Sequence, residues 1–236
     1  MLVKRICVLT GASGMLGSAF IERYRAQFEI AAIHHHHELS CASQNQRFVD
    51  PLEPSAALKK NEHPVFAIRA DLSTEQSTEF VCSTVLERFH GVDLLVNAAA
   101  YRHWNQLLAP YALADAEQTM NINVLAPIRL AVGFARLYWC FHPKENVKFR
   151  RNVINVSSTA GLYVYPDLGQ ALYATSKAAL NQATYHLASE LWDIGIRVNV
   201  VAPNSFPDIV PVESVLDQIA AFDNSEETGR ISVLHT

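Results

Sequence analysis

The sequence carries little charge for its length. Only 18% of its 236 residues are charged, and 19 basic against 23 acidic side chains leave a formal net charge of −4. Without a basic excess the chain has little to neutralise phosphates along a nucleic acid, so we expect no nucleic-acid partner. Half of the residues are hydrophobic, which argues against disorder and favours one domain over residues 1–236.

Cysteines and long apolar runs are also scarce. Cys7, Cys41, Cys82 and Cys140 show no C-x-x-C spacing, so we expect reduced, mostly buried thiols rather than a zinc site or a redox pair. No apolar run approaches the roughly 20 residues of a membrane span. The start, MLVKRICVLTGASG, is typical of a strand and a glycine turn rather than of a signal peptide. These absences predict a cytoplasmic protein without a membrane partner.

Short apolar runs alternate with helical patterns along the chain. Such alternation is typical of a parallel sheet buried on both faces, so we predict an α/β fold with a doubly wound parallel sheet in a single domain. Two excursions, 34–64 and 141–151, lie outside the pattern. The expected strands are 3–9, 29–33, 65–70, 93–97, 152–157, 196–202 and 231–234, and the expected helices are 18–27, 74–89, 115–138 (with a possible bend near Pro127), 172–192 and 214–222.

A glycine-rich turn, TGASGMLG, joins the first expected strand to the first helix. Gly11 and Gly14 would let the backbone turn tightly beside a pyrophosphate, and Gly17 would let the helix pack closely on the sheet. The free N–H groups and the dipole at a helix N-terminus attract phosphate. An ordinary tight turn is the alternative, but the position between strand and helix favours a dinucleotide cofactor. We expect Thr10 to tie the turn to neighbouring backbone.

Histidines stand at the end of the second expected strand, where a ribose-binding acid is expected about 20 residues after the glycines. The segment reads AAIHHHHELS, with His34 and His35 in place of the acid and Glu38 behind them. The missing carboxylate removes repulsion of a 2′-phosphate and the histidines can donate to it, so we favour NADP. Glu38 keeps NAD open because it could reach a ribose hydroxyl. Adjacent histidines rarely converge on one ion, so we expect no metal site.

Three further segments carry residue types suited to carbonyl reduction. Asn97-Ala98-Ala99-Ala100 follows the fourth expected strand, NVSS ending at Ser158 follows the fifth, and YATSK runs from Tyr173 to Lys177. In this order, after the glycine turn, they resemble the short-chain dehydrogenase/reductase superfamily over nearly the whole chain. The resemblance implies a Rossmann fold and an NAD(P)(H)-dependent oxidoreductase that interconverts a carbonyl and an alcohol by hydride transfer.

Tyr173 and Lys177 stand one helical turn apart and face the same direction. A free tyrosine has a pKa near 10, which makes it a weak acid–base group at neutral pH. We expect the charge of Lys177 to favour the phenolate and to lower the pKa of Tyr173. By resemblance, Tyr173 is the general acid/base, and Lys177 also holds the nicotinamide ribose hydroxyls.

Two more polar positions complete the expected catalytic set. By resemblance Ser158, rather than Ser157, hydrogen-bonds the substrate oxygen and stabilises developing negative charge. In NINVLAP, Asn123-Val124-Leu125-Ala126 matches the stretch that carries the family's proton-relay asparagine, so we choose Asn123. Asn121 is expected to be a surface or capping residue instead.

The cofactor-contacting set follows from the glycine turn, the histidines and the resemblance. Asp71, in RADLS, matches the family's adenine-contacting acid, while capping the next helix is its alternative, a role that Ser73 could also fill. The expected set is Gly11, Ser13, Gly14, Met15, Leu16, His34, His35, Asp71, Leu72, Asn97, Ala98, Ala99, Tyr173, Lys177, Pro203 and Ser205.

The sequence departs from the compact family pattern in three places. Met15 stands where that subtype has glycine, so the glycine spacing resembles the extended subtype, although only about 30 residues follow Pro203. Pro203-Asn204-Ser205 replaces Pro-Gly and a later threonine; Asn204 could take a positive φ and Ser205 could replace the threonine. The C-terminal region, about 203–236, leaves a short lid, which predicts an open cleft for a bulky, extended or carrier-attached substrate.

Alternatives remain for the function and for the loops. Many extended members act on nucleotide sugars, so a nucleotide-sugar reductase or epimerase is one alternative, and a non-catalytic NADP-binding sensor or scaffold is another. The intact catalytic set argues against the latter. By resemblance, a homodimer or homotetramer would form through helices 115–138 and 172–192. Five aromatic residues either line the substrate cleft or pack on the surface: Tyr101, His103, Trp104, Tyr163 and Tyr165.

Overall fold

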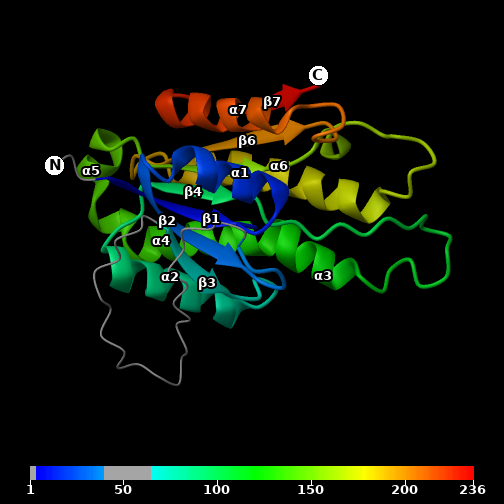
Figure 1. Cartoon of the computed structure of the whole chain (residues 1–236), viewed down its shortest axis with the longest axis horizontal. Coiled ribbons are helices and arrows are strands. Elements are labelled where there is room, and N and C mark those ends of the chain that lie inside the picture. Colours follow the sequence, from blue (N-terminus) through cyan, green and yellow to red (C-terminus); the bar gives the residue numbers. More distant parts are fainter. Residues whose placement is uncertain (1–3, 40–64) are drawn as a thin grey trace.

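The computed structural model describes residues 4–39 and 65–236, whose strands form one parallel sheet. Within these ranges seven strands are ordered β3-β2-β1-β4-β5-β6-β7, and each neighbouring pair is parallel (Figure 1). The chain winds outward from β1 to β3 and then crosses back to β4, which confirms the predicted doubly wound fold. The strands are β1 Arg5–Thr10, β2 Phe28–His34, β3 Val65–Arg69, β4 Leu94–Asn97, β5 Asn152–Val156, β6 Arg197–Pro203 and β7 Ile231–Leu234.

Helices cover both faces of the sheet, because successive strand residues point to opposite sides. Cys7 and Leu9 of β1 pack with α1 and α7, whereas Val8 between them packs with α2, α4 and α6. The central strands are therefore buried on both faces, as predicted, whereas the edge strand β7 is half-buried. The helical elements are α1 Met15–Tyr24, α2 Glu75–Phe89, α3 Ala116–Met120, the π-helical η1 Asn121–Leu125, α4 Ala126–Leu137, η2 Trp139–Phe141, α5 Pro143–Lys148, η3 Thr159–Gly161, α6 Ala171–Glu190 and α7 Val212–Asn224.

The start of α2 differs from the capping alternatives considered for Asp71 and Ser73. Thr74 is the N-cap, and its side chain accepts a hydrogen bond from the backbone N–H of Ser77. Asp71 instead accepts from the backbone N–H of Ser73 at 3.0 Å. The carboxylate of Asp71 thus belongs to the loop before the helix and not to its cap.

The expected helix 115–138 is a continuous helical run that includes one π-helical turn, η1. Pro127 follows this turn and has no backbone N–H to donate to the carbonyl of Asn123, four residues earlier. A π turn accommodates such a gap within a helix. The prediction of an irregularity near Pro127 is confirmed, and Asn123 lies within the irregular turn.

The helical run Ala116–Phe141 is long and apolar, which was not expected from the sequence. Its 26 residues include an 18-residue window with a mean hydropathy of 1.4, so by length and composition alone it could cross a membrane. In the fold, Leu130 and Phe134 are fully buried, and Phe134 packs its ring on Trp139 with 5.9 Å between centroids. The run is packed as a core helix of this domain.

Helix α5 lies within the expected excursion 141–151 and was missed. It is only six residues long and begins at Pro143. Its buried residue is polar: Asn146 donates to the carbonyl oxygens of Trp139 and Ile194. A short helix that is anchored by an amide carries no apolar periodicity, so the sequence pattern gave no signal for it.

The described cysteines are free thiols. Cys7 and Cys82 are buried and Cys140 is exposed, while Cys41 lies outside the described residues. Burial raises the pKa of Cys82 to about 12, so its thiol stays protonated at neutral pH. The expectation of buried thiols is confirmed for Cys7 and Cys82.

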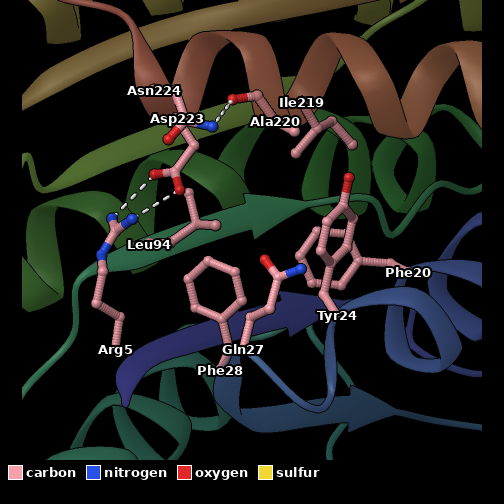
Figure 2. A pocket seen from close by; sticks show the side chains of 10 residues that line it. All are labelled: Arg5, Phe20, Tyr24, Gln27, Phe28, Leu94, Ile219, Ala220, Asp223 and Asn224. Atoms are coloured by element: carbon pink, nitrogen blue, oxygen red, sulfur yellow. Dashed lines mark hydrogen bonds and ion pairs between the residues drawn. The ribbon is translucent and has the colours of Figure 1, made fainter. Parts of the chain in front are cut away.

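The amino edge of the sheet, where the strands begin, carries buried and half-buried ion pairs. Arg5 donates to both carboxylate oxygens of Asp223, at 2.7 and 2.9 Å (Figure 2). Asn152 donates to the same carboxylate. Arg151 pairs with Asp93 at 2.9 Å. A cavity of about 180 Å³ lies beside the Arg5–Asp223 pair, between α1 and α7, and is lined in part by phenylalanine and tyrosine rings. None of the predicted site residues lines it.

Candidate active site

The glycine turn lies at the opposite, carboxyl edge of the sheet, between β1 and α1. Gly11 has φ +68°, and a β-carbon there would lie 2.8 Å from the backbone of Ala98. A β-carbon at Gly17 would lie 2.3 Å from the carbonyl oxygen of Gly11, so the third glycine lets α1 pack on the turn itself rather than on the sheet. Thr10 accepts hydrogen bonds from the backbone N–H groups of Ala98 and Ala99, which confirms its predicted structural role.

The N-terminus of α1 is open for an anion. Gly14 is the N-cap, in an extended conformation, and no side chain caps the helix. The backbone N–H groups of its first turn therefore keep no side-chain partner, which suits a phosphate group. Met15 is 55% exposed beside them, and Leu16 is buried in the core. Ser13 lies between the turn glycines Gly11 and Gly14.

A first cavity, of about 190 Å³, adjoins the turn. It brings together residues predicted from separate segments: the turn, the end of β2, the loop after β3 and the segment after β4. Glu38 is exposed and does not line it, so the alternative acid is not placed there. The predicted cofactor residues on its wall are Gly11, His34, His35, Asp71, Leu72 and Ala99, with Tyr101 also present.

The histidines at this cavity do not converge. The Nδ1 atom of His34 lies 3.1 Å from the carbonyl oxygen of His37, and the rings of His35 and His36 stack with 3.8 Å between centroids. Burial lowers the pKa of His35, although the charge of Asp71 opposes this shift. Within residues 4–39 and 65–236, no group of three or more His, Cys, Asp or Glu side chains is placed to hold a metal ion.

A second cavity, of about 260 Å³, forms a cleft at the same edge of the sheet. Ser158, Tyr173, Pro203 and Ser205 line it, so four predicted site residues from three segments meet there. Arg102, from the loop after β4, shares its wall. The cleft thus combines a serine and a tyrosine with a cation in one space.

Tyr173 sits near the start of α6, with 9% of its surface exposed. It shares the wall of the cleft with Ser158, whereas the hydroxyl of Ser157 donates to the carbonyl of Lys177 at 3.3 Å. Burial raises the pKa of Tyr173, and the interaction with Ser158 and the charge of Arg102 partly oppose this. The expected lowering of this pKa is therefore wrong for the structure, because burial of the phenol outweighs the groups that favour the phenolate.

Lys177 lies beneath Tyr173, with only 2% of its surface exposed. Its Nζ atom is 5.7 Å from the centroid of the Tyr173 ring and donates to the carbonyl oxygen of Val156 at 2.8 Å. Burial, assisted by the charge of Arg102, lowers the pKa of Lys177 to about 8. The ammonium group therefore lies in a buried, low-dielectric site on one face of the tyrosine ring.

Asn123 is fully buried in the π turn and holds the loop after β4. Its side chain accepts from the backbone N–H of Tyr101 at 2.7 Å and donates to the carbonyl of Tyr101 at 2.9 Å. It also donates to the hydroxyl of Ser176 at 2.9 Å. The side chain predicted for a proton relay is thus occupied in fixing this loop against α6.

Asn97 is placed inside the sheet. Its side-chain amide donates to Asn155 at 2.8 Å, and Asn155 donates to the hydroxyl of Thr184 on α6. The side chain of Asn97 therefore ties β4 to β5 and is not among the residues that line either cavity. Ala98 and Ala99, which follow it, reach the glycine turn through their backbone.

The loop after β6 shows how the missing Pro-Gly is replaced. Asn204 does not take a positive φ; its side-chain oxygen accepts from the backbone N–H of Ser205, and its own N–H donates to Leu234. Phe206 and Ile209 line the cleft, whereas α7 packs on α1 and β7 joins the sheet. Of the expected substrate region 203–236, only the loop lines the cleft.

The loop aromatics divide between the two roles considered for them. Trp104 and Tyr165 line the cleft, and Tyr165 donates to Thr159 at 2.9 Å. His103 instead lies 3.3 Å from the carboxylate of Asp115. Tyr163 is exposed on the surface, where its ring packs on His235.

Arg102 is a charged cleft residue that was not predicted from the sequence. The available signal was its position, two residues after the Asn97–Ala100 segment, because ligands of doubly wound folds bind beyond the carboxyl ends of the central strands.

Comparisons with known proteins agree with this geometry. The chain is 27% identical over 204 residues to glucose 1-dehydrogenase 2 of Bacillus subtilis, covering 86% of this chain and 72% of that protein. The structure superposes on a Brucella ovis short chain dehydrogenase/reductase in complex with a partially ordered NAD, with a TM-score of 0.73, 27% identity and coverage of 99% and 100%. It also superposes on Pseudomonas aeruginosa RhlG in complex with NADP, with a TM-score of 0.74, 25% identity and coverage of 99% and 96%.

The chain also matches a model of a whole protein family. The family model described as short chain dehydrogenase matches residues 5–207, from the start of β1 to the loop after β6. Two of the similar structures named above hold a nicotinamide cofactor, NAD in one and NADP in the other. The fold and the family match together show that the chain belongs to the short-chain dehydrogenase/reductase family of oxidoreductases.

Proposed function

We propose that this protein is an NADP(H)-dependent oxidoreductase that interconverts a carbonyl and an alcohol, with Tyr173 as general acid/base. The observation that carries the proposal is that Ser158 and Tyr173 line one cleft, with the buried Lys177 beneath the ring of Tyr173. The open glycine turn and the histidine-lined cavity at the same edge of the sheet support the cofactor. When bound, the nicotinamide accepts or supplies the hydride.

The residues of the cleft divide the remaining work. In the direction of reduction, Tyr173 donates its phenolic proton to the substrate oxygen, and Ser158 donates a hydrogen bond that stabilises the charge developing there. Lys177 makes one hydrogen bond among the described residues, which leaves ammonium protons for ribose hydroxyls. Asn123 acts as a positioning residue, because it fixes Tyr101 and the cleft loop.

The preference for NADP rests on the end of β2. His34 and His35 line the cavity where a carboxylate would repel a 2′-phosphate, and neutral imidazole still donates a hydrogen bond. Because burial lowers the pKa of His35, this residue gains charge only below its ordinary titration range. The preference for NADPH over NADH should therefore grow as the pH falls below about 6.5.

Titration with NADPH and NADH, followed by a carbonyl substrate panel with the preferred cofactor, tests the proposal. We expect tighter binding of NADPH and a reduction of that preference in His35→Ala. Tighter binding of NADH would overturn the cofactor assignment, and failure to bind either cofactor would overturn the proposed reaction.

We also propose association into a homodimer or homotetramer through α4 and α6. Leu137 on α4 is 55% exposed and Tyr185 on α6 is 45% exposed, so both helices present apolar surface beyond the core. Sedimentation of the full chain at several concentrations tests this, and a monomer throughout would contradict it.

A further inference from the structure

Arg102 brings a positive charge into the cleft that the proposed reaction does not use. It lines the same cavity as Ser158 and Tyr173, and its side chain is exposed. Within the described part of the chain it makes no hydrogen bond and no ion pair. A cationic side chain at a reacting centre without a counter-charge is available for an anionic ligand.

The loop around Arg102 is fixed although Arg102 itself is not. Asn123 holds the backbone N–H and carbonyl of Tyr101, the preceding residue. The carboxylate of Asp115 is bound by the hydroxyl of Tyr101 and by the ring of His103, the residues on either side of Arg102. The acid of this loop is therefore occupied, and Arg102 is left to face the cleft.

The remaining lining of the cleft offers no carboxylate. Among the described residues on its wall, the ionisable groups are Arg102 and the phenols of Tyr165 and Tyr173. Asp208 is near in sequence to the lining residue Ser205, and accepts from its hydroxyl at 3.4 Å, but does not line the cleft. Among the described residues, the cleft therefore carries one positive charge, bordered by apolar and uncharged polar side chains.

We propose that Arg102 determines specificity for substrates that carry an anionic group, a carboxylate or a phosphate, near the reacting carbonyl. The planar guanidinium binds either group with two parallel hydrogen bonds. This inference rests on the proposed function, because it assigns the substrate class of the same cleft. Trp104, Phe206 and Ile209 on the wall would contact the apolar part of such a substrate.

The charge of Arg102 also acts on the reacting groups. It lowers the pKa of both Tyr173 and Lys177, in each case as a smaller cause than burial. Removing it should therefore raise both pKa values and move the pH profile of turnover to higher pH. A merely structural role for Arg102 would not shift that profile.

Matched acid and neutral probes test the inference in the enzyme with NADPH present. Acetoacetate is compared with methyl acetoacetate, and dihydroxyacetone phosphate with dihydroxyacetone, by calorimetric binding and by turnover. We expect at least one acid to bind tenfold or more tightly than its neutral partner. Arg102→Gln should reduce that ratio at least tenfold, and Arg102→Lys should retain part of it. The probe pair that shows the preference distinguishes carboxylate from phosphate.

The control is Lys144→Gln, which removes one positive charge from the exposed surface of α5 at a residue that lines no described cavity. It should leave the acid-to-neutral ratio unchanged. Equal binding of acid and neutral probes, or an acid preference that persists in Arg102→Gln, would overturn the inference. Acid-selective binding without turnover of any probe would support the inference while counting against the proposed reaction.

Discussion

At the amino edge of the sheet, Arg5, Arg151 and Arg197 each donate to carboxylates or carbonyl oxygens. At the carboxyl edge, Arg102 has no such partner within the described residues, and Lys177 has a single one. Both edges belong to the same sheet, and both carry buried or cleft-lining polar groups. They differ in whether the cationic side chains are paired within the chain, although two buried atoms at the amino edge, Arg5 Nε and Asn152 Oδ1, also lack a hydrogen-bond partner among the described residues.

The physical reason for the difference is the penalty for burying unpaired charge. A buried charge without a partner destabilises the fold, so a purely structural site pairs it, as Asp223 does for Arg5. Burial lowers the pKa of Lys177 at the carboxyl edge and also that of Arg197 at the amino edge, but Arg197 donates to several carbonyl oxygens whereas Lys177 donates to one. In the proposed function, the remaining donors of Lys177 and the unpaired Arg102 are available to cofactor and substrate.

The largest effect is expected for Lys177→Met, in which function and stability should move in opposite directions. Turnover should fall by about 10²–10⁴-fold, because in the proposed function Lys177 binds the ribose hydroxyls of the cofactor beside Tyr173. The pKa of Lys177 is lowered from 10.5 to about 8. Below pH 8 the folded protein therefore holds a buried ammonium group, which lowers the free energy of unfolding. Denaturation at pH 7 should show the variant to be more stable by about 1–3 kcal/mol.

The sign of this stability effect provides a second check. Because the folded pKa lies below the unfolded one, the penalty is fully present below pH 8 and fades as the pH rises toward 10.5. The stability advantage of Lys177→Met should shrink over that window. A destabilised variant at pH 7 would contradict the view that Lys177 is retained for function.

A matched pair of variants tests the close packing of the glycine turn at the carboxyl edge. In Gly17→Ala the β-carbon would meet the carbonyl oxygen of Gly11 at 2.3 Å, whereas in Gly14→Ala the nearest contact is 3.2 Å. Overpacking of this kind costs about 1–3 kcal/mol, so cofactor binding should weaken about 5- to 150-fold in Gly17→Ala and less in Gly14→Ala. Calorimetric titration with NADPH measures both, and equal effects would contradict the close-packing role of Gly17.

The smallest effect on turnover is expected at the amino edge. Asp223→Ala removes both bonds to Arg5 and the one to Asn152, so unfolding should require about 2–3 kcal/mol less free energy. Turnover per folded molecule should stay within about twofold, because the pair lies at the far edge of the sheet. Urea denaturation and steady-state kinetics measure the two quantities, and a large loss of turnover at unchanged stability would break the comparison.

The fold could be predicted because apolar runs and helical patterns alternate without ambiguity. The glycine turn could be placed for the same reason, since it lies between a strand and a helix. The sequence did not reveal α5, whose anchor is the amide of Asn146, or the contact of Gly17 with the turn. Both depend on contacts with particular backbone carbonyl oxygens, which leave no periodic pattern in the sequence.

The residues of the site were predicted better than the pKa shifts of those residues. Ser158 and Tyr173 were expected together and meet in one cleft. The expected influence of Lys177 on Tyr173 assumed that one helical turn brings the ammonium to the phenol oxygen, but the ammonium lies beneath the ring and bonds Val156. Arg102 was missed because its position after the Asn97–Ala100 segment does not show which way a loop side chain points, and only the tertiary structure places it in the cleft.

The most direct test of the central claim is the turnover of Tyr173→Phe beside Tyr185→Phe, an exposed tyrosine on the same helix. We predict that Tyr173→Phe loses about 10²–10⁴-fold in NADPH-dependent carbonyl reduction while it still binds NADPH, and that Tyr185→Phe loses little. Turnover by Tyr173→Phe equal to that of the unaltered enzyme would contradict the assignment of Tyr173 as the acid/base group.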